Sequence, residues 1–143
     1  MHSYHCWINI NHQVYDVQWE EGEIDYDEYE RLQESLIKRL IQKIEEKGGP
    51  IKDEYTLVKS NNQTTLLFSG CRNHFYGEPL EVLEWIRENA PYSYGLLYSL
   101  DDEDRENHDN YIVYRLARNT LTKFNDQLLS PYMDTIEKGY FHD

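Results

Sequence analysis

The sequence predicts an α+β fold, in which an antiparallel or mixed sheet of about five strands carries two helices packed on one face. Three features predict this class. A strand pattern opens the chain, a long amphipathic helix follows it, and two strand pairs flank a second helix, in the order β, α, β, β, α, β, β. A chain of 143 residues can bury a core without disulfides or metals. We therefore expect one domain over residues 1–143, with residues 119–143 as an irregular C-terminal tail packed on it.

The first strand is predicted from alternation over residues 4–10. One side carries Tyr4, Cys6, Ile8 and Ile10, and the other carries His5, Trp7 and Asn9. We expect Trp7 to pack in the core. The chain has two cysteines, Cys6 and Cys71, with no CxxC motif and no multi-cysteine framework, so we expect both to be buried free thiols.

The clearest helix spans residues 25–47. Its apolar stripe follows three- and four-residue steps and consists of Tyr26, Tyr29, Leu32, Leu36, Ile37, Leu40, Ile41 and Ile44. Acidic residues occupy its first turns and Lys47 its last, which complements the helix dipole. The run Gly48-Gly49-Pro50 then ends the helix.

The remaining elements follow from turn residues and shorter apolar runs. A hairpin is expected over residues 55–58 and 64–69, a helix between Pro79 and Pro91 with Trp85 in the core, and a second hairpin over residues 94–100 and 111–117. The stretch 128–133 is apolar, so we expect it to pack over the sheet as a loop.

Charge restricts the class of partner. The chain holds 27 Asp and Glu against 14 Lys and Arg, a net charge of −13. This balance disfavours nucleic acid and anionic membranes and favours basic protein surfaces. No apolar run is long enough to span a bilayer and no signal peptide is visible, so we expect a cytoplasmic protein.

The most informative segment is the acidic run at residues 101–104, between two strand-like runs. We expect these carboxylates at the exposed end of a hairpin, where like charges repel and are best explained by a partner. A solvated loop that aids solubility is the alternative. The predicted partner-binding residues in this connector are Asp101, Asp102, Glu103, Asp104, Glu106 and Asp109.

A second acidic group precedes the long helix. It adds Trp19, Glu20, Glu21 and Glu23 to the predicted partner-binding residues, with Trp19 as an exposed aromatic anchor. The acidic residues that follow, Asp25, Asp27 and Glu28, are explained by the helix dipole.

The sequence carries no catalytic signature, and we predict no cofactor and no metal site. Two alternatives stay open: a calcium loop within residues 101–109, and a small enzyme that uses Cys71 as nucleophile with His74 as base. The first lacks the glycine at position six of a calcium loop, and the second depends on local proximity alone.

Several of these segments together resemble the immunity protein 7 family of bacterial polymorphic toxin systems. In chain order they are His5-Cys-Trp7, Ser69-Gly-Cys-Arg-Asn-His74, Glu84-Trp-Ile86, Ala90-Pro-Tyr-Ser-Tyr-Gly-Leu-Leu-Tyr98, the acidic run 101–104, Val113-Tyr-Arg-Leu-Ala-Arg118, Leu129-Ser-Pro131 and Asp134-Thr-Ile-Glu137. The chain departs from the family at Cys6, where a glycine is usual, and after Pro131, where a second proline is common.

The resemblance implies a non-enzymatic protein that binds and neutralises a cognate toxin domain. Nuclease-type toxins need basic active sites to hold phosphates, so an acidic inhibitor suits them. The expected partner is therefore a basic toxin surface, and the oligomeric state stays open.

Overall fold

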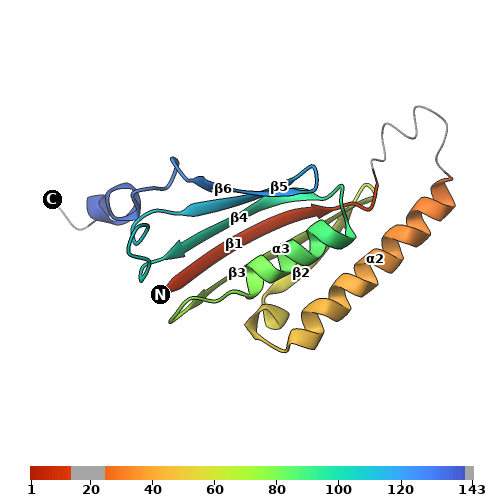
Figure 1. The fold of residues 1–143 in the computed structure, drawn as a ribbon, viewed down its shortest axis with the longest axis horizontal. Helices are drawn as coiled ribbons and strands as arrows, with labels where there is room; N and C mark the ends of the chain where they lie inside the picture. The colour runs from red at the N-terminus through yellow and green to blue at the C-terminus, as the bar shows by residue number, and fades with distance from the viewer. Residues whose placement is uncertain (14–24, 141–143) are drawn as a thin grey trace.

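The computed structural model describes residues 1–13 and 25–140, and its strands form one open sheet (Figure 1). The strands are β1 (His2–Ile10), β2 (Tyr55–Ser60), β3 (Gln63–Arg72), β4 (Tyr94–Asp101), β5 (Ile112–Ala117) and β6 (Thr120–Asn125). Within the described residues the order is β2-β3-β1-β4-β5-β6, and all neighbours are antiparallel. The predicted α+β class is confirmed, with an antiparallel sheet of six strands where about five were expected.

Strand β1 lies in the centre of the sheet and bonds to a strand on each side. Trp7, for example, is paired with Leu67 of β3 and with Leu96 of β4. Since β3 and β4 are both antiparallel to β1, they run parallel to each other with β1 between them. The connection from β3 to β4 therefore has to cross β1, and helix α3 (Glu78–Asn89) makes that crossing.

Both long helices begin and end at residues suited to those positions. Helix α2 (Tyr26–Lys47) starts after Asp25, whose carboxylate accepts from the backbone N–H groups of Asp27 and Glu28. It ends at Gly48, which adopts the left-handed conformation at φ 63°. A short helical turn, η1 (Pro50–Asp53), leads into β2, and Pro79 occupies the first turn of α3.

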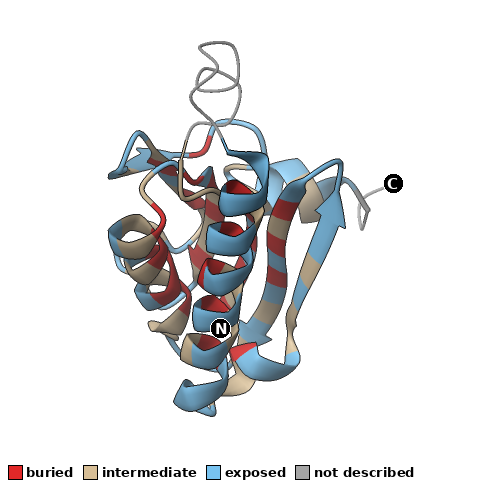
Figure 2. Cartoon of the chain, turned by 90° about the vertical axis from the view of Figure 1, so that its right-hand side faces the viewer, coloured by how far each residue is buried: buried red, intermediate tan, exposed pale blue. Residues whose placement is uncertain are grey.

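The core lies between the helices and one face of the sheet. Alternate residues of β1, including Tyr4 and Ile8, meet Leu40 of α2 and Leu83 of α3 in a single buried cluster. Figure 2 shows the buried positions on the inner side of α2 and the exposed ones on its outer side. The predicted packing of two helices on one face is confirmed, and neither α2 nor α3 covers the opposite face of the sheet.

A polar network fixes the junction between η1 and β2. The Tyr4 hydroxyl donates to the Glu54 carboxylate, which also accepts from the Arg72 guanidinium. Burial raises the pKa of Tyr4, and the bond to Glu54 raises it further. The network ties β1 and β3 to the start of β2. Because the pKa of Tyr4 is raised, its phenol keeps the proton that it donates to Glu54.

The sixth strand corrects the prediction of an irregular tail over 119–143. Residues Thr120–Asn125 pair with β5 as strand β6. Arg118 and Asn119 both adopt positive φ values, 50° and 58°, and form the two-residue turn that matches the twist of a hairpin. Arginine is not a usual residue at that position, so residue preferences do not predict this turn.

Three side chains lie elsewhere than predicted. Trp7 is 41% exposed, because odd positions of β1 point away from the helices, and Cys71 is exposed for the same reason on β3. Leu128 is 76% exposed, since Asp126 accepts the backbone N–H groups of Leu128 and Leu129 in a turn that directs Leu128 outward. Cys6 is buried as predicted, and Trp85 is half-buried against the edge of the core.

The approach of β4 to β1 depends on Gly95. A Cβ atom at this position would overlap the backbone carbonyl oxygen of Trp7 and lie 2.7 Å from the Cα of Ile8. We predict that Gly95→Ala lowers the free energy of unfolding by about 2 kcal/mol or more, because the two central strands must separate. Chemical denaturation followed by circular dichroism measures the change.

The matched control is Gly139→Ala, because a Cβ atom at Gly139 meets no atom within 4 Å. An unfolding free energy for Gly95→Ala equal to that of the control would show that the strands are not held this closely.

Candidate interaction site

The acidic loop, residues 101–109, connects β4 to β5 at one end of the sheet. Asp101 is the last residue of β4, and the other predicted carboxylates of this connector follow it in turns. The structure thus brings together Asp101, Asp102, Glu103, Asp104, Glu106 and Asp109, and the predicted hairpin is confirmed.

Three of these carboxylates face the backbone and shape the loop. Asp101 accepts from the N–H of Glu103 at 3.1 Å, and Asp104 accepts from the N–H of Glu106 at 3.0 Å. Asp109 accepts from the N–H of Met133 at 2.9 Å, which holds the C-terminal segment against the loop. These side chains replace the backbone partners that a turn leaves unpaired.

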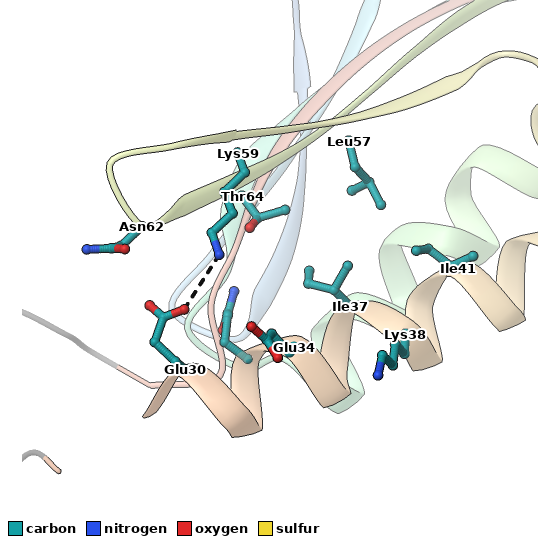
Figure 3. A pocket seen from close by; sticks show the side chains of 10 residues that line it. Glu30, Glu34, Ile37, Lys38, Ile41, Leu57, Lys59, Asn62 and Thr64 are labelled. Atoms are coloured by element: carbon teal, nitrogen blue, oxygen red, sulfur yellow. Dashed lines mark ion pairs between the residues drawn. The ribbon is translucent and has the colours of Figure 1, made fainter. Parts of the chain in front are cut away.

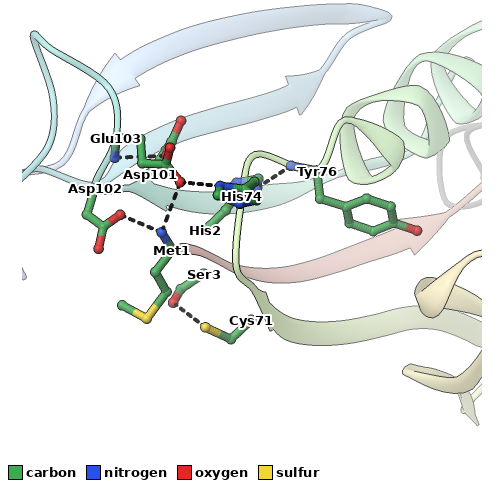
Figure 4. Close-up of polar contacts among 9 residues, drawn as sticks. All are labelled: Met1, His2, Ser3, Cys71, His74, Tyr76, Asp101, Asp102 and Glu103. Atoms are coloured by element: carbon green, nitrogen blue, oxygen red, sulfur yellow. Dashed lines mark hydrogen bonds and ion pairs between the residues drawn. The ribbon is translucent and has the colours of Figure 1, made fainter.

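The carboxylates of Asp102 and Glu103 lie outward, beside the chain terminus (Figure 4). The Met1 ammonium is 2.5 Å from Asp102 and 3.6 Å from Glu103, and Nδ1 of His74 is 2.7 Å from Glu103. About half of each carboxylate side chain remains exposed. Glu106 is exposed as well, so three carboxylates of the loop reach solvent.

These contacts shift two ionisation equilibria. The hydrogen bond from His74 lowers the pKa of Glu103, and the bond to Asp102 raises the pKa of the Met1 amino group. Both shifts favour the charged forms, a carboxylate at Glu103 and an ammonium group at Met1.

Apolar side chains flank the acidic loop and were not predicted as site residues. Met1 is exposed and accepts from the Asp102 N–H through its carbonyl, and Met133 is exposed beside Asp109. Phe75 is 61% exposed and lines a small cavity together with Asp101 and Asp104. No sequence periodicity marks these residues, because three separate segments supply them.

The second predicted group, Trp19, Glu20, Glu21 and Glu23, lies outside the described residues.

The side chains of Cys71 and His74 face different partners. The sulfur of Cys71 lies 3.5 Å from the Ser3 hydroxyl, whereas His74 bonds to Glu103 (Figure 4). Within the described part of the chain, no hydrogen bond joins Cys71 to His74, and no group of three or more His, Cys, Asp or Glu side chains could hold a metal ion. The geometry offers no support to the nucleophile and base pair.

A separate groove of about 360 Å³ runs between α2 and the β2–β3 hairpin (Figure 3). Ile37, Ile41 and Leu57 line it, and an ion pair of 3.6 Å between Lys59 and Glu30 crosses one end. Charges of both signs border the groove, and the carboxylates of the acidic loop are not among its described lining residues.

One family match covers every strand of the sheet and both long helices. The family model for immunity protein 7 matches residues 1–138 of the 143. The chain belongs to the immunity protein 7 family. The resemblance found in the sequence is thereby confirmed, whereas no curated protein and no solved structure matches the chain.

Membership of the immunity protein 7 family assigns the chain an immunity role, in which the partner is a cognate toxin. The family match spans both the acidic loop and the C-terminal segment that it holds. Over residues 1–13 and 25–140, no helix combines the length and apolarity needed to cross a membrane.

The contact between His74 and Glu103 predicts a measurable titration. We expect His74→Ala to raise the pKa of the Glu103 carboxyl toward its ordinary value, because the largest cause of its lowered pKa is the hydrogen bond from His74. A lowered pKa in the fold means that the contact stabilises the protein above the pKa of unfolded Glu103, and that this contribution is lost as the pH falls through the folded pKa. NMR titration of the side-chain carboxyl measures it.

The control is His108→Ala, which removes an exposed histidine of the acidic loop that contains Glu103. Equal pKa values of Glu103 in the two variants would show that His74 does not act on it.

Proposed function

We propose that this immunity protein neutralises its cognate toxin by stoichiometric binding, and that the acidic loop contacts a basic surface of a nuclease-type toxin domain. The chain would act in the cytoplasm and perform no chemistry. Nucleic acid and membranes are not expected partners, because the net charge of −13 repels both phosphates and anionic lipids.

The loop carboxylates fall into two groups, one bonded to the backbone and one exposed, and this difference supports the proposal. Asp101, Asp104 and Asp109 bond to backbone N–H groups, so the loop has a defined shape before any partner arrives. Asp102, Glu103 and Glu106 keep exposed carboxylates. A preformed loop loses little conformational freedom on binding, which favours affinity.

The apolar neighbours of the loop suit a protein partner. Phe75, Met1 and Met133 are exposed around the carboxylates. Contact with water alone does not explain apolar side chains at these positions. Interfaces between proteins commonly combine such apolar contacts with a polar rim. A loop that served only solubility would need the charges and not these side chains.

A surplus of negative charge would also speed the encounter. Electrostatic steering raises association rate constants to about 10⁸ M⁻¹s⁻¹ at low salt. Fast capture matters for an inhibitor, because each toxin molecule left unbound continues to act.

Charge reversal of the outward carboxylates tests the proposal. We predict that the triple variant Asp102→Lys, Glu103→Lys and Glu106→Lys lowers the association rate constant for the toxin domain encoded beside this chain by at least about tenfold at low salt, because steering depends on the sign of the loop. Surface plasmon resonance at several salt concentrations measures the rate. The three loop-shaping aspartates stay unchanged, so the loop keeps its backbone hydrogen bonds.

The matched control reverses Glu34, Glu46 and Glu88 to Lys on the helices, which changes the net charge by the same amount. We expect the control to slow association much less. Equal rate constants for the two triple variants would remove the acidic loop from the interface, and a wild-type chain that neither binds nor inhibits the toxin would end the proposal.

A further inference from the structure

The face of the sheet opposite the helices, here the open face, carries apolar and aromatic side chains. One row across it is set by the strand register and runs Thr56, Leu67, Trp7, Leu96, Arg115 and Thr122. Trp7 lies at the centre of the sheet and meets Tyr94 edge-on at 6.2 Å between ring centroids. If this face contacted only water, polar residues would be expected at these positions of the central strands.

Charged groups near Trp7 are already engaged within the protein: Glu54, which lines the recess beside Trp7, accepts from Tyr4 and Arg72. Arg115 places its guanidinium over the ring of Phe124 at 4.6 Å, toward the β6 edge. Burial lowers the pKa of His5, the neighbour of Trp7 on this face, which favours the neutral ring. Tryptophan and tyrosine surrounded by uncharged side chains are typical of the energetic centre of a protein interface.

A recess lies beside Trp7 and offers room for a partner's side chain. It has a volume of about 470 Å³, and its lining includes His5, Leu67, Tyr98 and the charged residue Glu54. Trp7 forms one wall of the recess. Well-packed pockets next to an aromatic anchor are where binding energy concentrates in interfaces.

The open face continues to the acidic loop through a chain of aromatic rings. His5 and Tyr98 both contact Tyr111, at 6.4 and 6.0 Å between centroids, and Tyr111 contacts Tyr132 at 6.3 Å. The backbone N–H of Tyr132 donates to the carbonyl of Asp109 in the acidic loop. Packed aromatic side chains, with Tyr111 buried among them, therefore connect the surroundings of Trp7 to the acidic loop.

Charge decides which partner suits this surface. A second copy of the chain would bring another net charge of −13 and place like charges together. A basic protein that is apolar where it meets Trp7 complements both parts. We infer that the open face centred on Trp7 is the anchoring surface for the cognate toxin domain, an inference that rests on the proposed function and adds the apolar part of the same interface.

Removing the indole without changing charge tests the inference. For Trp7→Ala we expect the Kd for the toxin domain encoded beside this chain to rise at least about thirtyfold, through faster dissociation. The association rate constant should stay within about threefold of the wild type, because the acidic loop is intact. Surface plasmon resonance separates the two rate constants, and circular dichroism shows whether the variant is folded.

The matched control is Trp85→Ala, which removes a half-buried indole from the helix layer. Leu67→Ser, at an exposed position next to Trp7 in the register, carries the same test should Trp7→Ala fail to fold. We expect Leu67→Ser to raise the dissociation rate constant and Trp85→Ala to leave it within about threefold of the wild type.

Each contrary outcome identifies what failed. If wild type binds the toxin and both open-face variants bind equally tightly, the anchoring surface is wrong and the proposed function stands. If sedimentation shows a wild-type dimer that Trp7→Ala dissociates without loss of toxin affinity, a second copy covers the open face and the inference is overturned. If the wild type does not bind the toxin at all, both proposals fall.

Discussion

The pairing of β1 on both of its edges is the constraint on which the rest of the structure depends. Because β3 and β4 bond to its two sides, β1 has no free edge, and its alternate side chains must serve two different surfaces. One set, with Tyr4 and Ile8, lies in the core beneath the helices. The other set, with Trp7, lies on the open face. Gly95 permits the close approach of β4 that this arrangement needs. The helix layer and the proposed binding layer are therefore fixed by the same strand.

The acidic end of the molecule shows how a cluster of like charges is accommodated. Backbone N–H groups donate hydrogen bonds to Asp101, Asp104 and Asp109. His74 bonds to Glu103, and the Met1 ammonium pairs with Asp102. Repulsion among these groups is thus partly offset within the protein. What remains exposed is a smaller, positioned set of carboxylates. A protein of net charge −13 can in this way keep a defined loop at its most acidic point and still attract a positively charged partner.

Most of the fold could be predicted from the sequence, because α2 carries a long apolar stripe with suitable ends and the hairpin strands alternate clearly. The strand β6 was missed because its turn begins with Arg118, a residue that no turn preference favours. The position of Trp7 was missed because alternation identifies two sides of a strand without saying which side the helices cover. The acidic loop was recognised from its charges. Its backbone hydrogen bonds and its neighbours Phe75 and Met133 could not be, since contacts between distant segments leave no local pattern.

The strand order also determines when the chain can fold during synthesis. His2 pairs with Arg72 and with Asp101, so the centre of the sheet joins segments that are far apart in the chain. Such pairings close large loops and make folding slower than in helical bundles of similar size. During synthesis the core cannot assemble until β4 has left the ribosome. A chain that ends before β4 therefore lacks the central strand pairing and cannot form the core.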